Sequence, residues 1–273
     1  MSKKTRPLAT RIIVGLALGG VFIFSLANPL LFLLLVVAAA ALGAFELGNA
    51  MRKSGWHVPR FIAAICAAAI VTAAYFYGAT GQWLALVASV AAMVFWRVGF
   101  LLISKTKQSL KQTIRDFGAS TFTLIYVPLL ASFMVLMINL DRGTQLVFSM
   151  VLTVSMIDTA GFLVGRVLGR TKLAPGISPK KTFEGLLASA IAALLTGQVA
   201  AWLMEASFGW GLLFSAVILL SAVLGDLSES LIKRDLEVKD MGDVLPGHGG
   251  IMDRLDSILP SAFMAYLLSH VIF

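Results

Sequence analysis

The sequence is poor in charged residues and nearly devoid of cysteine. Only 13% of its 273 residues are Asp, Glu, Lys or Arg, whereas 59% are hydrophobic, and the mean hydropathy is +0.90. A soluble domain of this length does not need so much apolar surface, so the composition predicts an all-α, polytopic membrane protein. The single cysteine, Cys66, lies in an apolar run, which excludes a disulfide framework and a cysteine-based metal site within one chain.

The net charge of +8 does not indicate a nucleic-acid partner. Basic residues alternate with apolar segments along the chain, a pattern typical of membrane topology rather than of a nucleic-acid-binding surface. The N-terminus resembles a signal peptide, because basic residues precede an apolar stretch. Further apolar segments follow at once, so we expect this stretch to be retained as the first membrane span.

Nine apolar segments are candidates for crossing the bilayer. They are residues 11–27, 30–48, 61–78, 82–97, 118–139, 144–165, 185–204, 210–232 and 255–273. Asn28-Pro29 separates the first two, since proline cannot continue the hydrogen-bond ladder of a helix. If the N-terminus is cytoplasmic, every Lys and Arg except Arg142 falls on the cytoplasmic side. We therefore expect about nine transmembrane helices and a cytoplasmic N-terminus.

The chain is expected to have two regions. Residues 1–140 are expected to form an N-terminal transmembrane region of about five spans, and residues 141–273 a C-terminal transmembrane region that contains the candidate catalytic residues described below. Within the first region, the segment 103–117 is too polar to span, and its basic residues recur every four positions beside apolar ones. This pattern predicts a helix lying on the cytoplasmic leaflet, with an ordinary cytoplasmic loop as the alternative.

The end of the eighth span, GDLSESLIKRD, carries the first of three charged features. Helical spacing places Asp226, Glu229, Ser230 and Lys233 on one face. Carboxylates inside a span cost several kcal/mol unless they are paired, hydrated or bound to metal, which makes them candidates for function. The alternative is that the two carboxylates simply pair with Lys233 and Arg234 at the helix end.

The second feature is the segment 239–256, KDMGDVLPGHGGIMDRLD, whose glycines allow tight turns and close approach to a ligand. Mg²⁺ prefers oxygen ligands, commonly one or two carboxylates together with substrate phosphates. Asp226 and Asp253, at the ends of facing helices, would suit that task. Basic side chains could hold phosphate oxygens; they are Lys233, Lys239 and Arg254. Three roles are open for His248: a metal ligand, a hydrogen-bond donor to phosphate, or a loop residue without a direct role.

The third feature, residues 158–185, combines Asp158 inside the sixth span with the glycine-spaced Arg166 and Arg170. Its SPKKTFEG stretch supplies hydroxyls and positive charge; these residues are Ser178, Lys180, Lys181 and Thr182. Such a stretch suits a polyanion such as a nucleoside triphosphate, although a plain positive-inside loop is the alternative. The pattern G-x-x-x-x-G-K-[ST] is absent from the sequence, so P-loop chemistry is not supported.

Together these motifs resemble those of a known family. Ser230-x-x-Lys233-Arg234, Lys239-Asp240 and the following GDVLPGHGGIMDRLD are similar to the signature of phosphatidate cytidylyltransferases, also called CDP-diacylglycerol synthases. SPKKTFEG and Asp158 resemble a second region of that family, in which many members have Ala-Tyr where this chain has Gly161-Phe162. The motifs cover roughly residues 158–257, and the N-terminal half agrees in hydropathy alone.

The resemblance implies a Mg²⁺-dependent reaction of CTP with phosphatidate, giving CDP-diacylglycerol and pyrophosphate, at the cytoplasmic face of the cell membrane. It also implies a possible homodimer. The expected metal ligands are Asp226 and Asp253, followed by Asp256 and Glu229. The residues expected at phosphates are Lys233, Lys239 and Arg254. The residues expected to bind substrate are Asp158, Ser178, Lys180, Lys181, Thr182, Ser230, Arg234, His248, Gly249 and Gly250.

Two other classes of membrane protein share some of these features. A secondary transporter also has many spans and intramembrane carboxylates, but it does not need a glycine-rich basic loop flanked by aspartates. A lipid-alcohol kinase of related architecture would use a nucleotide as phosphate donor. The three classes differ in what they transfer from CTP to lipid: CMP, phosphate or nothing. Acyl-chain preference and the choice between CTP and dCTP are left open by the sequence.

Overall fold

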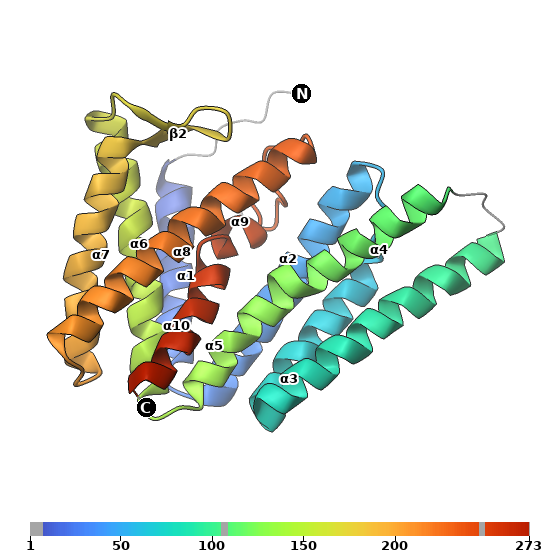
Figure 1. The fold of residues 1–273 in the computed structure, drawn as a ribbon, viewed down its shortest axis with the longest axis horizontal. Helices are drawn as coiled ribbons and strands as arrows, with labels where there is room; N and C mark the ends of the chain where they lie inside the picture. The colour runs from blue at the N-terminus through green and yellow to red at the C-terminus, as the bar shows by residue number, and fades with distance from the viewer. Residues whose placement is uncertain (1–7, 105–108, 246–248, 273) are drawn as a thin grey trace. The chain divides into compact units, whose positions relative to one another are not determined.

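A computed structural model of the chain describes residues 8–104, 109–245 and 249–272 (Figure 1). Six helices in these ranges are long and apolar enough to cross a membrane; they are Pro29–Lys53, Arg60–Ser104, Leu110–Ile138, Gly143–Val167, Phe183–Leu203 and Phe208–Asp235. The prediction of a helical protein with several membrane spans is therefore confirmed. The count of nine spans and the orientation of the N-terminus stay predictions.

The chain divides into two compact units. The first unit contains Met1–Leu136 and Leu236–Arg254, and the second contains Met137–Asp235 and Leu255–Phe273. By its contacts, the glycine-rich segment Leu236–Arg254 groups with the N-terminal helices. The sequence-based division into residues 1–140 and 141–273 stays a prediction.

The first unit is built around α2. Its helices are α1 (Leu8–Ser25), α2 (Pro29–Lys53), α3 (Arg60–Ser104), α4 (Leu110–Leu124) and the start of α5 (Leu130–Ile138), with a π-helical turn, Ile125–Leu129, between the last two. Asn28 caps α2 by accepting a hydrogen bond from the Leu30 N–H at 2.8 Å, and Pro29 occupies the first helical turn. The break expected at Asn28-Pro29 is therefore confirmed.

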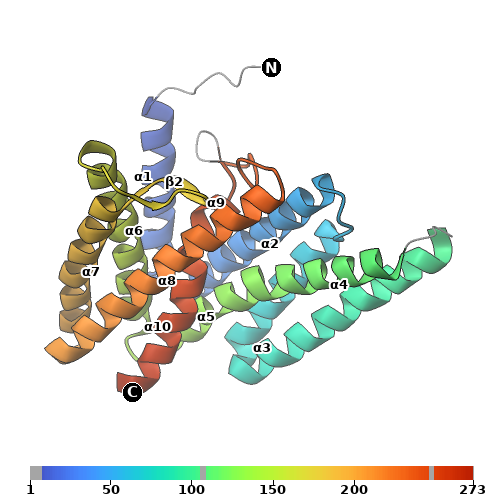
Figure 2. The same ribbon diagram turned by 45° about the horizontal axis from the view of Figure 1, so that its top comes forward.

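The helix α3 has two arms that meet at Gly78. This glycine has φ 63° and ψ −154°, a conformation that residues other than glycine rarely adopt. The two arms lie side by side (Figure 2), and Cys66 of the first arm forms a hydrogen bond with Ser89 of the second. The arms coincide with the third and fourth predicted spans, 61–78 and 82–97.

The predicted surface helix 103–117 falls on several parts of the structure. Its start is the end of α3, residues 105–108 lie outside the described residues, and the rest forms the first turns of α4. Ser109 and Gln112 form a capping box at the start of this helix, which belongs to the candidate span Leu110–Ile138. Within it, Asp116 is buried and pairs with the guanidinium of Arg97. Contact of this segment with the leaflet stays a prediction.

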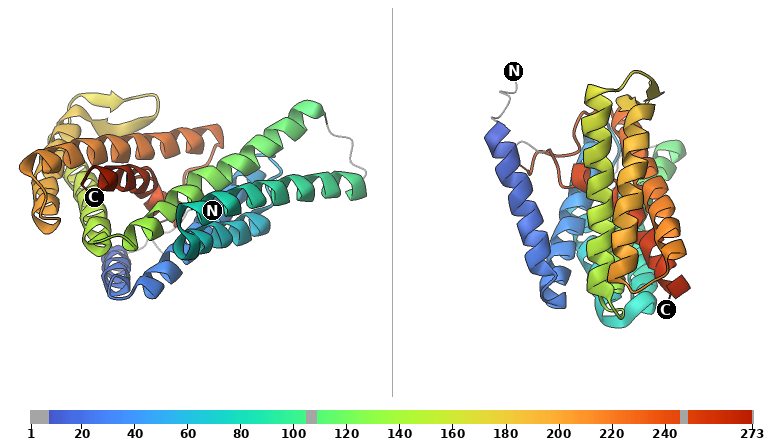
Figure 3. Two further views of the ribbon diagram at one scale, coloured as in Figure 1. Left: turned by 60° about the horizontal axis from the view of Figure 1, so that its bottom comes forward. Right: turned by 90° about the vertical axis from the view of Figure 1, so that its left-hand side faces the viewer.

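The second unit contains four long helices and a small hairpin. Its elements are α6 (Gly143–Val167), β1 (Lys172–Ala174), β2 (Ser178–Thr182), α7 (Phe183–Leu203), α8 (Phe208–Asp235) and α10 (Ile258–Ile272). The short helix α9 (Met252–Leu255) precedes α10. Within this unit, α7 packs between α6 and α8, and α10 packs on α8 (Figure 3). The antiparallel hairpin pairs Lys172 with Thr182 and lies beside the adjoining ends of α6 and α7 (Figure 3).

Small residues bring α6 and α7 close together. The Ser189 hydroxyl donates to the Ile157 carbonyl at 2.7 Å, and a Cβ added to Gly161 would lie only 2.5 Å from the Ser189 oxygen. A Cβ on Gly185 would lie 2.7 Å from the Gly161 carbonyl oxygen. In this packing, alanine at position 161 would require the Ser189 side chain to shift. The neighbouring Phe162 is 62% exposed, as expected for a side chain that faces lipid.

Arg142, the one basic residue predicted to lie outside the cytoplasm, has an acidic partner. Its guanidinium donates to the Glu205 carboxylate, which lies between α7 and α8. The hydrogen bond and the positive charge of Arg142 lower the pKa of this exposed carboxyl group. The ion pair offsets the positive charge of Arg142.

Candidate active site

The acidic face of α8 is the starting point of the site. Lys233 Nζ lies 2.6 Å from Glu229 Oε2, and the Ser230 hydroxyl donates to Asp226 Oδ1 at 3.5 Å. These contacts join residues four positions apart, as helical periodicity predicts. Glu229 is fully buried, whereas the side chain of Lys233 is one-fifth exposed. The face therefore holds a buried carboxylate with its lysine beside a more exposed aspartate.

Asp256 joins this face because α8 has a glycine opposite it. A Cβ on Gly225 would overlap the Asp256 carbonyl oxygen and lie 2.8 Å from Pro260 Cγ, so the close approach requires glycine. Asp256 shares a hydrogen bond with Glu229 and experiences the negative charge of Asp226. Neighbouring carboxylates repel each other when they are ionised, and positive charge beside them offsets this repulsion. We call Asp226, Glu229 and Asp256 the carboxylate cluster.

The basic hairpin reaches the same cluster. Lys181, on β2, places its Nζ 2.6 Å from Asp226 Oδ2. The guanidinium of Arg234 donates to the Ile177 carbonyl, which fastens the hairpin turn to the end of α8. The structure thus brings together two charged features that are about 45 residues apart in the chain. The alternative considered for the carboxylates of α8 was pairing with basic residues at the end of the same helix. It holds for Glu229 with Lys233, whereas Asp226 pairs with Lys181 on the hairpin.

The other hairpin candidates have different environments. Lys180 is exposed and Ser178 is half-buried. Thr182 is buried; its Oγ1 accepts the Gly185 N–H at 3.1 Å and so caps α7. A Cβ on Gly169 would lie 2.7 Å from Thr182 Cγ2, so the threonine also packs against the end of α6. The structure gives Thr182 a role in orienting the hairpin.

Asp158 lies on the exposed side of α6, and the nearby Arg166 and Arg170 are also exposed. Lys239 and Arg254 are exposed in the first unit. His248 lies outside the described residues.

In the first unit, Asp253 organises the glycine-rich loop. Its carboxylate accepts the Gly250 N–H at 2.7 Å and the Met241 N–H at 3.2 Å. Gly249 has φ 85°, which only glycine adopts readily, and its carbonyl accepts the Leu245 N–H at 2.9 Å. Asp253 is 8% exposed, so in this structure its carboxylate supports the loop backbone.

Glu46, on α2, is a second buried carboxylate at this loop and was not among the sequence-based candidates. It is 3% exposed and accepts the Met252 N–H at 2.9 Å. The available signal was an acidic residue inside the apolar segment 30–48, the same kind of signal that had pointed to Asp158.

The residues present suit Mg²⁺ by their donor chemistry. Among the described residues, no three His, Cys, Asp or Glu side chains are grouped so as to hold a metal ion. Mg²⁺ nevertheless commonly takes one or two protein carboxylates and completes its shell with water and phosphates, and the cluster offers neighbouring carboxylates of this kind. Asp226 and Asp253 belong to different units, so a metal shared by these two residues stays a prediction.

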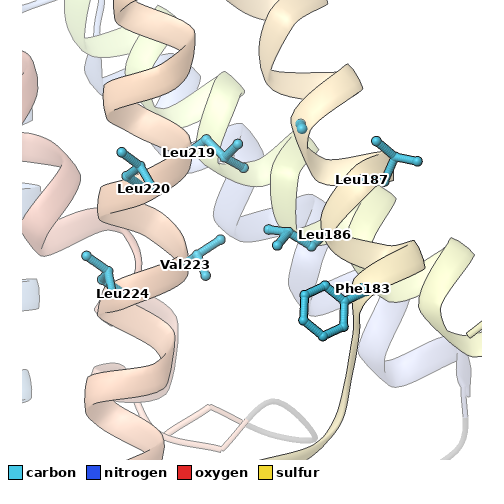
Figure 4. Close-up of a pocket in the computed structure, with 8 residues that line it drawn as sticks. Phe183, Leu186, Leu187, Leu219, Leu220, Val223 and Leu224 are labelled. Atoms are coloured by element: carbon cyan, nitrogen blue, oxygen red, sulfur yellow. The ribbon is translucent and has the colours of Figure 1, made fainter. Parts of the chain in front are cut away.

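An apolar groove runs between α7 and α8, with a volume of about 510 Å³ (Figure 4). Its lining residues are Phe183, Leu186, Leu187, Ala190, Leu219, Leu220, Val223 and Leu224. In the sequence, Phe183 follows Lys181 by two positions and Leu224 precedes Asp226 by two. The groove is thus lined by residues within two positions of each member of the Lys181–Asp226 ion pair and continues along apolar side chains.

Comparison with known proteins gives consistent matches. The sequence model described as the cytidylyltransferase family matches residues 9–272. The chain is 34% identical to the phosphatidate cytidylyltransferase of Mycobacterium bovis over 275 residues, which covers 98% of this chain and 90% of that protein. It is 34% identical over 273 residues to the protein of the same name from Mycobacterium leprae, covering 96% and 88%. The phosphatidate cytidylyltransferase of Brucella suis is 40% identical over 148 residues, 52% of this chain and 54% of that protein.

Proposed function

The chain belongs to the cytidylyltransferase family, and from this premise we propose which of its residues carry out the reaction. The enzyme transfers CMP from CTP to phosphatidate and releases pyrophosphate, giving CDP-diacylglycerol. The observation that carries the residue assignment is the Lys181–Asp226 ion pair, because it joins the basic hairpin to the carboxylate cluster beside an apolar groove.

In this reaction a phosphate oxygen of phosphatidate attacks the α-phosphorus of CTP, and the bond from that phosphorus to the oxygen bridging to the β-phosphorus breaks. Phosphatidate is already an anion, so no strong base is needed, and the bridging electron pair leaves with pyrophosphate. Catalysis then depends on aligning two polyanions and neutralising their charge. Lys181 and Lys233 donate to phosphate oxygens, and Arg234 keeps the hairpin beside them.

The carboxylates of Asp226 and Asp256 would hold Mg²⁺, with Glu229 as the next candidate ligand. When bound, the ion neutralises phosphate charge and polarises the phosphorus–oxygen bonds. Asp253 stays the candidate ligand from the first unit, beside its role in the loop. Lys239 and Arg254 are exposed cations that suit the triphosphate, and Ser178 and Lys180 suit the nucleotide.

The α7–α8 groove takes an acyl chain of phosphatidate. Its lining is apolar and lies within two candidate spans, where a lipid chain can enter from the bilayer. The lipid phosphate then lies near Lys181 and Asp226, where the groove begins. This arrangement suits a substrate with one charged end and two hydrocarbon tails.

We place this site at the cytoplasmic face of the cell membrane, in a protein of nine spans whose N-terminus is cytoplasmic. The distribution of basic residues supports that orientation. Labelling of a cysteine introduced at position 239, in a variant without Cys66, tests it: access from the outside would contradict the topology. A homodimer rests on the resemblance alone.

The product formed from labelled CTP tests the chemistry. With Mg²⁺ and phosphatidate, label in the α-phosphate should enter the lipid, and label in the γ-phosphate should appear in pyrophosphate. Entry of γ-label into the lipid would instead indicate a kinase, and no transfer of either label would contradict the proposed chemistry.

A further inference from the structure

Glu46 is a buried acidic side chain for which the proposed chemistry has no direct use. It lies in α2 within a candidate membrane span and is only 3% exposed. A buried carboxylate is unfavourable unless hydrogen bonds or opposite charges compensate for its lost hydration. Its presence in an otherwise apolar helix therefore calls for specific partners.

The specific partner is a backbone N–H group of the glycine-rich segment. The Met252 N–H donates to Glu46 Oε2 at 2.9 Å, across 206 positions of sequence. The backbone groups of Ile251 and Val244 lie near the same carboxylate. One side chain thus meets the segment on both sides of its central residues, since Val244 precedes them and Ile251 follows them.

Two glycines of the segment fit closely around the same carboxylate. A Cβ on Gly242 would overlap Glu46 Oε1, and its three nearest atoms would all belong to the Glu46 side chain. A Cβ on Gly250 would overlap Oε2 and would also lie 2.8 Å from the Gly242 nitrogen. The glycine at position 242 is therefore matched specifically to Glu46.

The loop held in this way also carries Asp253. Gly250 packs against Glu46 and donates its N–H to Asp253 at 2.7 Å, so both carboxylates contact the same short stretch of backbone. Ser54, also near the end of α2, donates to the Leu236 carbonyl at 2.8 Å and anchors the start of the segment. Glu46 thus fixes the part of the segment that leads directly into Asp253 and Arg254.

We infer that Glu46 is a positioning residue for the reaction. It binds no substrate; its carboxylate holds the stretches 242–245 and 249–252 so that Asp253, Arg254 and the glycine backbone of these stretches keep a fixed geometry. The inference rests on the proposed function, because that function assigns the segment to the active site. Truncation of Glu46 should therefore loosen the loop and slow turnover, without removing a group that contacts the reacting atoms.

Hydrogen exchange and steady-state kinetics of the full-length protein in detergent test this role together. In Glu46→Ala, the amides of 242–245 and 249–252 should exchange at least tenfold faster, and kcat should fall on the order of 10²-fold, the scale of a misplaced active-site group. Glu46→Gln keeps one carbonyl acceptor and should recover part of both losses. Glu237→Gln is the control, because Glu237 is an exposed carboxylate of the same unit.

A paired substitution keeps the test decisive if Glu46→Ala folds poorly. Gly242→Ala alone should loosen the loop and lower kcat, because its methyl group overlaps Glu46. Combined with Glu46→Ala the overlap is gone, so the double variant should lose less activity than the product of the two single losses. Gly118→Ala is the matched control, since a Cβ there meets no atom within 4 Å.

Unchanged exchange in 242–245 and 249–252 in Glu46→Ala would overturn the inference, as would strictly multiplicative losses in the double variant. Faster exchange with unchanged kcat would also overturn it, because Glu46 would then have a structural role alone. If the wild-type protein transfers no CMP, the proposed function fails, whereas the exchange measurement still tests whether Glu46 holds the loop.

Discussion

Lys181 Nζ lies 2.6 Å from Asp226 Oδ2, which connects a two-stranded hairpin to the acidic face of a membrane-spanning helix. The contact places a phosphate-binding type of side chain directly beside a metal-binding type. Neither residue is fully buried: their side chains are 24% and 31% exposed, which leaves room for a ligand to reach both. The ion pair is therefore suited to open and rearrange when charged substrates bind.

Lys181→Ala should reduce kcat/KM for CMP transfer on the order of 10²-fold, because one preorganised charge donor is lost. Lys172→Ala is the matched control: Lys172 is an exposed lysine of the neighbouring strand. Initial rates normalised to folded protein compare the two. Equal, small effects of both substitutions would remove Lys181 from the site.

Lys233→Ala should lower kcat/KM by on the order of 10²–10³ per folded molecule. Lys233 also neutralises the buried Glu229, so this variant should be less stable as well. Glu229→Gln combined with Lys233→Ala removes the unpaired buried charge and should restore stability without restoring activity. A loss of activity below about threefold would leave Lys233 with the structural role alone, since about 0.6 kcal/mol is too small for a transition-state contact.

Ala190→Trp should fill the groove between α7 and α8 and raise the KM for long-chain phosphatidate on the order of tenfold. A short-chain phosphatidate leaves much of the groove empty, so its KM should change less. Leu195→Trp serves as control, because Leu195 is exposed on the same helix but does not line the groove. If the KM changed equally for the long-chain and the short-chain substrate, the acyl chains would not bind in this groove.

Gly161→Ala should destabilise the protein by about 1–3 kcal/mol, because its methyl group meets the Ser189 hydroxyl at the α6–α7 contact. Replacing Ser189 with alanine in the same chain removes the obstructing oxygen and should recover most of the loss. Thermal unfolding midpoints in detergent measure both changes. An unchanged midpoint in Gly161→Ala would show that the α6–α7 contact accommodates the added methyl group without loss of stability.

Local periodicity predicted the contacts within α8. The spacing of Asp226, Glu229, Ser230 and Lys233 sufficed, because helical neighbours are fixed by sequence distance. The break before α2 was predictable for a similar reason, since proline cannot extend a hydrogen-bonded turn and asparagine readily caps one.

Contacts between distant segments were not predictable in the same way. The pairing of Lys181 with Asp226 depends on how the hairpin folds back on α8, and the sequence alone does not specify that geometry. The capping role of Thr182 at the start of α7 was not predicted either, and its binding of nucleotide stays a prediction. Glu46 was missed because its partners are backbone groups some 200 residues later, which leave no side-chain motif to recognise.

Mg²⁺-dependent CMP transfer by Asp226→Asn tests the central claim most directly. Asparagine keeps the size of the side chain but removes the charge that pairs with Lys181 and holds the metal, so the rate of α-label transfer from CTP to phosphatidate should fall by at least about 10²-fold. Raising the Mg²⁺ concentration should recover that rate only in part, and the circular dichroism and elution volume in detergent should match those of the wild type. A folded Asp226→Asn protein that transfers CMP at the wild-type rate and with the wild-type Mg²⁺ dependence would contradict the account.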